Sequence, residues 1–277
     1  MIAHFGVVAA LLLCLLGFAV GIFGTLVGAG GGFILTPVLL LLYPQDAPAL
    51  ITAISLVAVF FKAGSGSIAY ARQLRIDYRS GLVFALATLP GAVLGVITAR
   101  AVSRPGFDVV MGLVLIGLAG SLTRGFAEPS DHGPGRGVPR SLIDREGKRY
   151  RYRADVRLGA VLSVGVGFLS SFLGIGGGVI HVPLLVAVLG FPPHVATATS
   201  HFVLAIMALV ATITHAALGT FHHTVGLRRA AALAVGVVVG AQIGAILSQR
   251  LSGKVIQRLL AVGLLLLGLR LLLNVAV

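Results

Sequence analysis

The sequence predicts an all-α protein, a polytopic transmembrane bundle of eight to ten membrane segments built from two inverted repeats with glycine-rich broken helices. Composition is the first observation behind this prediction. Of the 277 residues, 57% are hydrophobic and 10% are charged, the mean hydropathy is +1.05, and a soluble domain carries about 25% charged residues. Apolar residues gather into runs near 5–43, 49–71, 80–99, 106–123, 158–189, 195–218, 230–249 and 259–277, and about 20 residues suffice to span a membrane.

Other classes of protein fit the composition poorly. A β-barrel requires alternating apolar and polar residues, which these runs lack. The first run has no basic segment before it and no small-residue cleavage site after it, so we expect an uncleaved helix. Cys14 is the only cysteine, which excludes an internal disulfide and a thiolate metal cluster. The net charge of +13 is explained by basic loops beside a lipid bilayer rather than by nucleic acid. We therefore expect a multi-pass membrane protein with no cofactor.

An internal repeat is the second observation. A shift of 146 residues gives seven matches in twelve positions, pairing Gly28, Gly30, Gly31, Gly32, Ile34, Pro37 and Leu39 with Gly174, Gly176, Gly177, Gly178, Ile180, Pro183 and Leu185. After short gaps the match continues and pairs Ser55 with Ser200. Repeats of this length define the architecture of a chain. We divide the chain into a first transmembrane repeat at 1–123, a basic linker at 124–157 and a second repeat at 158–277.

Loop charge predicts the orientation of the two repeats. Nine basic residues lie in 124–157, so the positive-inside rule places this linker in the cytoplasm. The linker also shows the signals of a small hairpin around Glu146 and Gly147. The basic loop at 72–79 lies two crossings upstream and falls on the same side, whereas its counterpart at 216–227 has no Lys or Arg. The bias is exchanged between the halves, as an inverted repeat requires.

The length of the first run in each half is the third observation. Residues 5–43 as one helix would be about 58 Å long, against a hydrocarbon core of roughly 30 Å. The run must therefore break and fold back, and the glycine clusters are where it can, because glycine tolerates the dihedral angles of a break. The same argument applies to 158–189. For the scattered Gly91, Gly95, Gly240 and Gly244 we expect close helix packing instead.

A break inside a membrane is a candidate binding site. It leaves backbone N–H groups that must line a cavity or bind something, and the helix that restarts after it presents an N-terminus that favours anions. Two such breaks that meet near the midplane are typical of secondary transporters. Neither glycine cluster has the context of a nucleotide-binding loop. The predicted ligand is a small anion.

Ionisable residues within apolar runs are few. Lys62 is either a countercharge for an anion or an amine that reaches the nearer interface. His181 and His201 lie near the second break or the helix after it, and each either donates to an anion, carries a proton or is a satisfied polar residue of the bundle. None of the eight Asp and Glu lies well within an apolar run. No carboxylate pair or metal motif indicates an enzyme, and Gly64-Ser65-Gly66 is an incomplete serine-nucleophile motif.

These motifs resemble the sulfite exporter TauE/SafE family. The resemblance rests on Gly28-Ala-Gly-Gly-Gly-Phe-Ile-Leu-Thr-Pro37, on Gly174-Ile-Gly-Gly-Gly-Val-Ile-His-Val-Pro183 and on Ala196-Thr-Ala-Thr-Ser200. It implies a bundle in the cytoplasmic membrane that exports small sulfur-containing anions such as sulfite, sulfoacetate or thiosulfate. A passive anion channel or a membrane scaffold is the alternative. The candidate substrate-binding residues are Gly28, Gly30, Gly31, Gly32, Pro37, Ser55, Lys62, Gly174, Gly176, Gly177, Gly178, His181, Pro183, Ser200 and His201.

Overall fold

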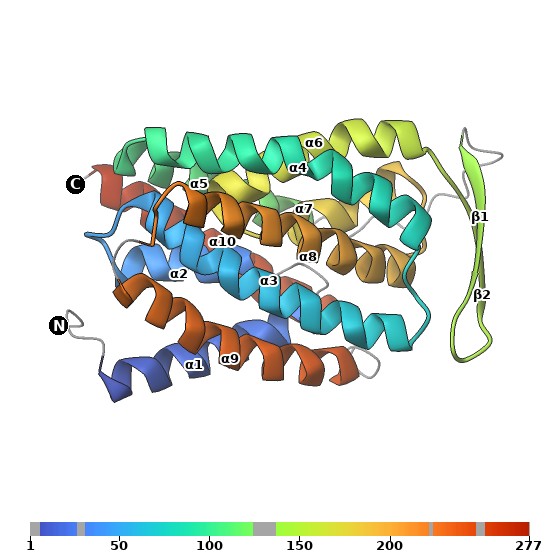
Figure 1. Ribbon diagram of the computed structural model, residues 1–277, viewed down its shortest axis with the longest axis horizontal. Helices are drawn as coiled ribbons and strands as arrows, with labels where there is room; N and C mark the ends of the chain where they lie inside the picture. Colours follow the sequence, from blue (N-terminus) through green and yellow to red (C-terminus); the bar gives the residue numbers. More distant parts are fainter. Residues whose placement is uncertain (1–5, 27–30, 124–136, 222–223, 248–252, 277) are drawn as a thin grey trace.

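The computed structural model describes residues 6–26, 31–123, 137–221, 224–247 and 253–276, and over these ranges the predicted all-α bundle is confirmed. Helices lie side by side along the long axis, and a two-stranded antiparallel hairpin crosses one end (Figure 1). The elements are α1 (Val7–Leu26), α2 (Gly32–Leu42), α3 (Pro48–Arg72), α4 (Tyr78–Ala101), α5 (Arg104–Thr123), β1 (Val138–Ile143), β2 (Arg149–Ala154), α6 (Val156–Leu173), α7 (Gly178–Pro183) with a π-helical continuation (Leu184–Val188), α8 (Pro193–Ala217), α9 (Thr224–Leu247) and α10 (Gly253–Ala276).

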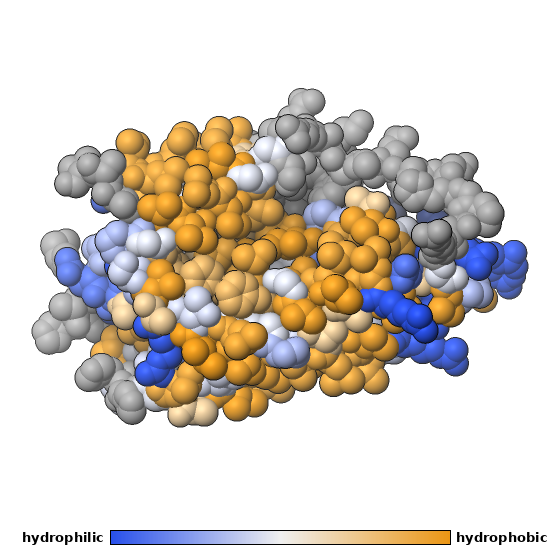
Figure 2. Space-filling view, turned by 90° about the horizontal axis from the view of Figure 1, so that it is seen from above, coloured by the Kyte–Doolittle hydropathy of each residue, from blue (hydrophilic) through white to orange (hydrophobic). Residues whose placement is uncertain are grey.

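The bundle has the dimensions and surface of a membrane protein. Among the described residues, six helices are long and apolar enough to cross a bilayer, namely α1, α3, α4, α6, α8 and α9. Shorter apolar helices occupy Gly32–Leu42, Gly178–Val188 and Ala261–Asn274. Hydrophobic side chains cover the middle of the molecule, and hydrophilic ones gather toward its ends (Figure 2). Such a surface faces hydrocarbon in the middle and water at both ends, so the multi-pass prediction is confirmed.

Helix boundaries follow from a few residues at the loop junctions. Pro48 and Pro193 occupy the first turns of α3 and α8, where a missing N–H has no cost because that group has no partner inside the helix. Asp77 and Asp155 precede α4 and α6, and each carboxylate accepts a hydrogen bond from the amide three residues later, at 3.1 and 3.0 Å. These caps satisfy amides that the helix itself leaves free.

Helix order is the same in both halves. A short helix holds the second position in each, α3 and α8 both have 25 residues, and α4 and α9 both have 24. The first helix of each half packs on a helix of the other half: α1 packs on α9, and α6 packs on α4. In Figure 1, α1 runs toward the hairpin end and α6 starts beside the hairpin and runs the opposite way. These directions support the inverted relation of the repeats, which itself stays a prediction.

Small residues let α4 approach α6 closely, and α9 approach α1. Gly91 and Gly95 of α4 lie against the backbone of α6, and Gly240 and Gly244 of α9 lie against the backbone of α1. A Cβ built on Gly95 would lie 2.8 Å from a backbone amide nitrogen of α6, and one on Gly244 would lie 2.6 Å from a backbone carbonyl of α1. The packing role predicted for these four glycines is therefore confirmed, as expected for helices that associate in lipid.

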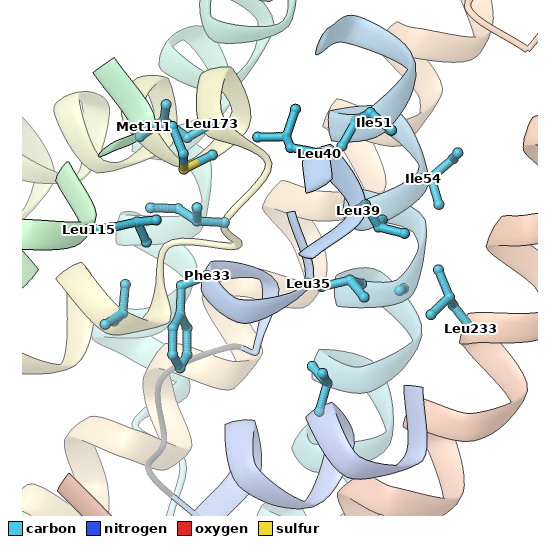
Figure 3. Close-up of a cluster of buried hydrophobic side chains, with 14 of the residues drawn as sticks. Phe33, Leu35, Leu39, Leu40, Ile51, Ile54, Met111, Leu115, Leu173 and Leu233 are labelled. Carbon is cyan, nitrogen blue, oxygen red and sulfur yellow. The ribbon is translucent and has the colours of Figure 1, made fainter. Parts of the chain in front are cut away.

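The short helix α2 lies in the centre of the core. Its side chains Phe33, Leu35, Leu39 and Leu40 are fully buried. Figure 3 shows them among Ile51 and Ile54 of α3, Met111 and Leu115 of α5, Leu173 at the end of α6 and Leu233 of α9. Because helices from both halves surround it, the N-terminus of α2 at Gly31 and Gly32 is buried inside the bundle.

The hairpin predicted in the linker is present, and it packs on the loop between α3 and α4. Arg75 of that loop pairs with Asp144 at 3.4 Å, and Arg140 pairs with Asp77 at 3.6 Å. The Tyr152 hydroxyl donates to the same Asp77 carboxylate at 2.8 Å. The two basic segments therefore lie at one end of the bundle, as predicted. That this end is cytoplasmic stays a prediction from loop charge.

Docking of the hairpin should depend on acid pH through Asp144. Burial alone would raise the pKa of this carboxyl, but the amides of Lys148 and Glu146, the Tyr150 hydroxyl and the charge of Arg75 outweigh it and hold the pKa below its usual value. Stability from such a group is present above the unfolded pKa of about 3.9 and is lost as pH falls through the folded pKa. We expect proteolysis within the hairpin to be slow at pH 7 and to accelerate below about pH 4.

The matched variant for this measurement is Asp144→Asn. It should already be cleaved faster than wild type at pH 7 and should lose the acid-dependent acceleration. Equal cleavage of the two proteins across the whole pH range would contradict the role of this carboxylate.

Candidate functional site

Both long apolar runs are interrupted, as their length predicted. One interruption separates α1 from α2, and the other separates α6 from α7. In the first, Gly31 has a φ of 74°, and in the second Gly174, Gly176 and Gly177 have φ values of 67°, 72° and 52°. These left-handed conformations are strained for residues that carry a Cβ. Gly28 and Gly30 lie outside the described residues.

The two breaks are in direct contact. A Cβ built on Gly32 would lie 2.6 Å from the carbonyl oxygen of Ile175 and 2.8 Å from that of Gly174. The Gly174 carbonyl also accepts hydrogen bonds from the Thr36 hydroxyl at 2.8 Å and from the Ser55 hydroxyl at 2.7 Å. The first half thus holds the second break in place. The Ser55 hydroxyl, a predicted ligand group, donates to the backbone here.

The rest of the second break is closely packed. A Cβ on Gly176 would lie 2.6 Å from a methyl carbon of Val59, and one on Gly177 would collide with the Ser170 hydroxyl. Gly178 begins α7, a helix of six residues. These contacts leave little room at the second break and indicate a role in packing.

Lys62 lies at the first break. Its side chain is 1% exposed, and its amine has no hydrogen-bond partner among the described residues. A Cβ built on Gly24 would lie 3.0 Å from Nζ of Lys62 and 2.8 Å from the amide nitrogen of Gly31. The amine, the end of α1 and the residue before α2 therefore converge on one place. The alternative that Lys62 reaches an interface is wrong, because the side chain is buried in the bundle.

His201 of α8 faces the same stretch of α3, one turn further on. A Cβ on Gly66 would lie 2.7 Å from Cδ2 of His201 and 3.3 Å from Nε2. Nδ1 lies 3.0 Å from the Thr197 carbonyl oxygen, which can only accept, so Nδ1 carries the hydrogen and Nε2 presents a lone pair. Nε2 is buried and has no partner among the described residues. In this form His201 can accept a proton but cannot donate from Nε2.

His181 occupies a different neighbourhood. Its Nε2 lies 3.4 Å from the Ser163 hydroxyl of α6, and its ring stands edge-on to Phe84 of α4 at 6.0 Å. Pro183 ends α7 where the π-helix begins, and Pro37 lies inside α2. The structure thus groups Lys62 with His201 and gives His181 a separate set of partners.

Several hydroxyl groups beside the breaks were not singled out from the sequence. Thr25 lies in the last turn of α1, and Ser170 and Ser171 lie in the last turn of α6. All three hydroxyls are buried without a partner among the described residues, as is that of Ser200, a predicted ligand. The shift of 146 residues that pairs the glycine clusters also pairs Thr25 with Ser171. In the sequence, that pairing could have indicated Thr25 and Ser171.

The charge around the first break is of one sign. No Asp or Glu occurs in α1, α2, α3, α4, α6, α8 or α9, the helices that surround Lys62 or pack on its helix. The N-terminus of α2, with its partial positive charge, lies beside the amine. Because buried polar groups normally have partners, the unpaired amine and the helix terminus together form a site that suits an anion.

Comparison with known proteins identifies similar chains. The family model described as "Sulfite exporter TauE/SafE" matches residues 13–271. The "Probable membrane transporter protein YunE" of Bacillus subtilis is 30% identical over 94% of this chain and 96% of its own length. "Probable membrane transporter protein MJ0441" of Methanocaldococcus jannaschii is 25% identical over 88% of each chain. No solved structure matches.

Proposed function

Because this chain belongs to the sulfite exporter TauE/SafE family of membrane transporters, we propose that it is a secondary carrier that exports a small sulfur-containing anion across the cytoplasmic membrane. The proposed substrate class is sulfite, sulfoacetate, thiosulfate or a similar anion. The observation that carries the proposal is the buried amine of Lys62, which has no partner among the described residues and lies beside the N-terminus of α2.

Electrostatics supports an anion at this place. An isolated charge in a membrane interior is expensive, and ionisable residues there normally face a partner or a pathway. Lys62 has no carboxylate on the surrounding helices, so a bound anion would supply the missing countercharge. Amides at the start of α2 would donate to the same anion, because a helix N-terminus is an anion-binding element.

The geometry assigns different roles to the two breaks in this proposal. The first break, with Gly31, Gly32 and Lys62, would bind the anion. The second break would hold the first break in position. The Gly174 carbonyl already accepts hydrogen bonds from two hydroxyls, and the backbone at Gly174 packs against Gly32. The second break, which lies near His181, is therefore the weaker candidate for binding in this proposal.

A counterflow experiment tests the proposed function. Purified protein in proteoliposomes loaded with unlabelled sulfite, sulfoacetate or thiosulfate should accumulate labelled thiosulfate transiently above equilibrium, because a carrier exchanges substrate across the membrane. A channel allows equilibration without this overshoot. Protein-free liposomes provide the background. Absence of anion uptake with all three internal anions would refute the proposal, and uptake without overshoot would favour a channel.

A further inference from the structure

We propose that Lys62 takes up a proton together with the anion, so that each transport cycle moves one proton with each anion. The inference rests on the proposed function and names the proton as a second ligand of the same site. In the empty carrier, no anion is present to balance a charge on Lys62.

A protonated Lys62 in the empty carrier would be a buried ammonium ion without a countercharge. Among the described residues, Gly24 of α1 and Gly31 before α2 lie beside Lys62, and His201 of α8 lies one turn along α3. The helices α2, α4 and α6 contribute no Asp or Glu. From α9, the neutral Gln242 donates to Ser65 of α3. None of these groups is an anion.

The carboxylates in the loops before and after α3 have other partners. Arg229 of α9 pairs with Asp46 and lies over the Tyr43 ring at 3.7 Å. Asp77 pairs with Arg140 of the hairpin. Neither carboxylate is therefore a countercharge for Lys62. Burying an unpaired ion is so costly that the group becomes neutral instead, and the empty carrier should hold Lys62 as an amine.

The proton balance of the cycle follows. On the loading side, the amine of Lys62 takes a proton from water and becomes an ammonium ion that pairs with the anion. On the opposite side the anion leaves, and the ammonium ion returns its proton to water because its countercharge is gone. The amine is then neutral again and the empty site can reorient. The net charge moved per cycle is that of the anion plus one positive charge.

His201 is the other titratable group at this place. The lone pair of its Nε2 lies beside Gly66, four residues after Lys62 on α3, and its ring packs edge-on against Tyr70 at 5.2 Å. Its Nδ1 hydrogen is engaged by the Thr197 carbonyl. If Nε2 of His201 rather than Lys62 took the proton, the number of protons per anion would be the same. Substitution of one of the two groups therefore distinguishes them.

The decisive substitution is Lys62→Arg. Arginine keeps the positive charge but is not deprotonated in proteins. A loaded Lys62→Arg carrier can still exchange one anion for another, whereas its empty form carries an uncompensated charge and cannot return. We therefore expect this variant to retain thiosulfate counterflow, to lose net thiosulfate uptake and to carry no protons.

The measurement compares proton and anion uptake in the same proteoliposomes, with a trapped pH indicator and labelled thiosulfate or sulfoacetate, two dianions at neutral pH. Wild type should take up about one proton per anion, as the charge balance of Lys62 requires. The control Lys148→Arg makes the same change on the exposed hairpin and should keep the wild-type ratio and net uptake.

The outcomes separate this inference from the function on which it rests. Anion uptake without protons in wild type overturns the inference and leaves the proposed carrier intact. Net uptake with protons by Lys62→Arg shows that another group carries the proton, and it also overturns the inference. If neither anion enters with wild-type protein, the proposed function itself is refuted. Should Lys62→Arg fail to fold, His201→Gln decides instead: about one proton per anion supports Lys62 as the proton carrier, and anion uptake without protons overturns the inference.

Discussion

Gly32→Ala should destabilise the protein and abolish transport, because the added methyl group has no space between the two breaks. Its Cβ would lie 2.6 Å from the Ile175 carbonyl oxygen and 2.8 Å from that of Gly174, and both obstacles are backbone atoms. Relief requires α2 or the second break to shift, which strains the hydrogen bonds that Thr36 and Ser55 donate to Gly174.

The expected size of this effect follows from overpacking. Extra methyl groups in a packed core cost about 1–3 kcal/mol, which corresponds to a fall in Tm of about 2–12 °C for a protein of this size. Thermal unfolding in detergent, followed by size-exclusion chromatography, measures it. Transport should be lost even where folded protein survives, because the α2 N-terminus no longer faces Lys62.

Gly165→Ala is the matched control for this prediction. Gly165 lies on α6 with no atom within 4 Å of a Cβ built there, so the same methyl group meets open space. This variant should unfold at or slightly above the wild-type temperature, since alanine is the better helix former. Equal Tm values for Gly32→Ala and wild type would show that the contact between the breaks is not as close as described.

The architecture was predictable because it depends on length and composition. An apolar run of 39 residues at 5–43 cannot be one transmembrane helix, and glycine is where it can break, so the two interruptions followed from the sequence. The close packing at Gly91 and Gly244 was predictable for the same kind of reason, since small residues serve helix contacts in lipid.

The site was predictable only in part, because the sequence does not say which helix faces which. His181 stands three residues after a glycine cluster, yet its ring packs on Phe84 and Ser163. Lys62 is thirty residues from Gly32 along the chain and nevertheless lies at the first break. Proximity in sequence therefore does not show which side chains meet, and only the packing of α1, α2 and α3 brings the amine to Gly31.

The two halves also supply different residues to the proposed site, although their sequences are related. The register that pairs Ser55 with Ser200 places Met207 opposite Lys62 and Leu56 opposite His201. Each half therefore supplies one polar group to a site that its counterpart fills with an apolar side chain. The proposed site would therefore be single rather than repeated in each half, which agrees with the proposed transfer of one anion per cycle.

Lys62→Met should abolish anion transport without loss of stability. Methionine nearly matches the shape of the lysine stem and removes the amine, so the anion loses its countercharge. Removal of one partner from a buried charge pair costs about 2–5 kcal/mol, which is a loss of affinity of roughly 30-fold to several-thousand-fold. Labelled thiosulfate uptake at limiting concentration measures this loss.

Stability distinguishes binding from a structural role in the same experiment. The amine of Lys62 has no partner among the described residues, and replacing an unpartnered buried polar group by an apolar one of similar shape is neutral or stabilising. The Tm of Lys62→Met should therefore equal or exceed that of wild type, while Lys148→Met on the hairpin should keep wild-type transport. A fall in Tm that parallels the loss of transport would mean that Lys62 supports the fold, and unchanged uptake would mean that the anion binds elsewhere.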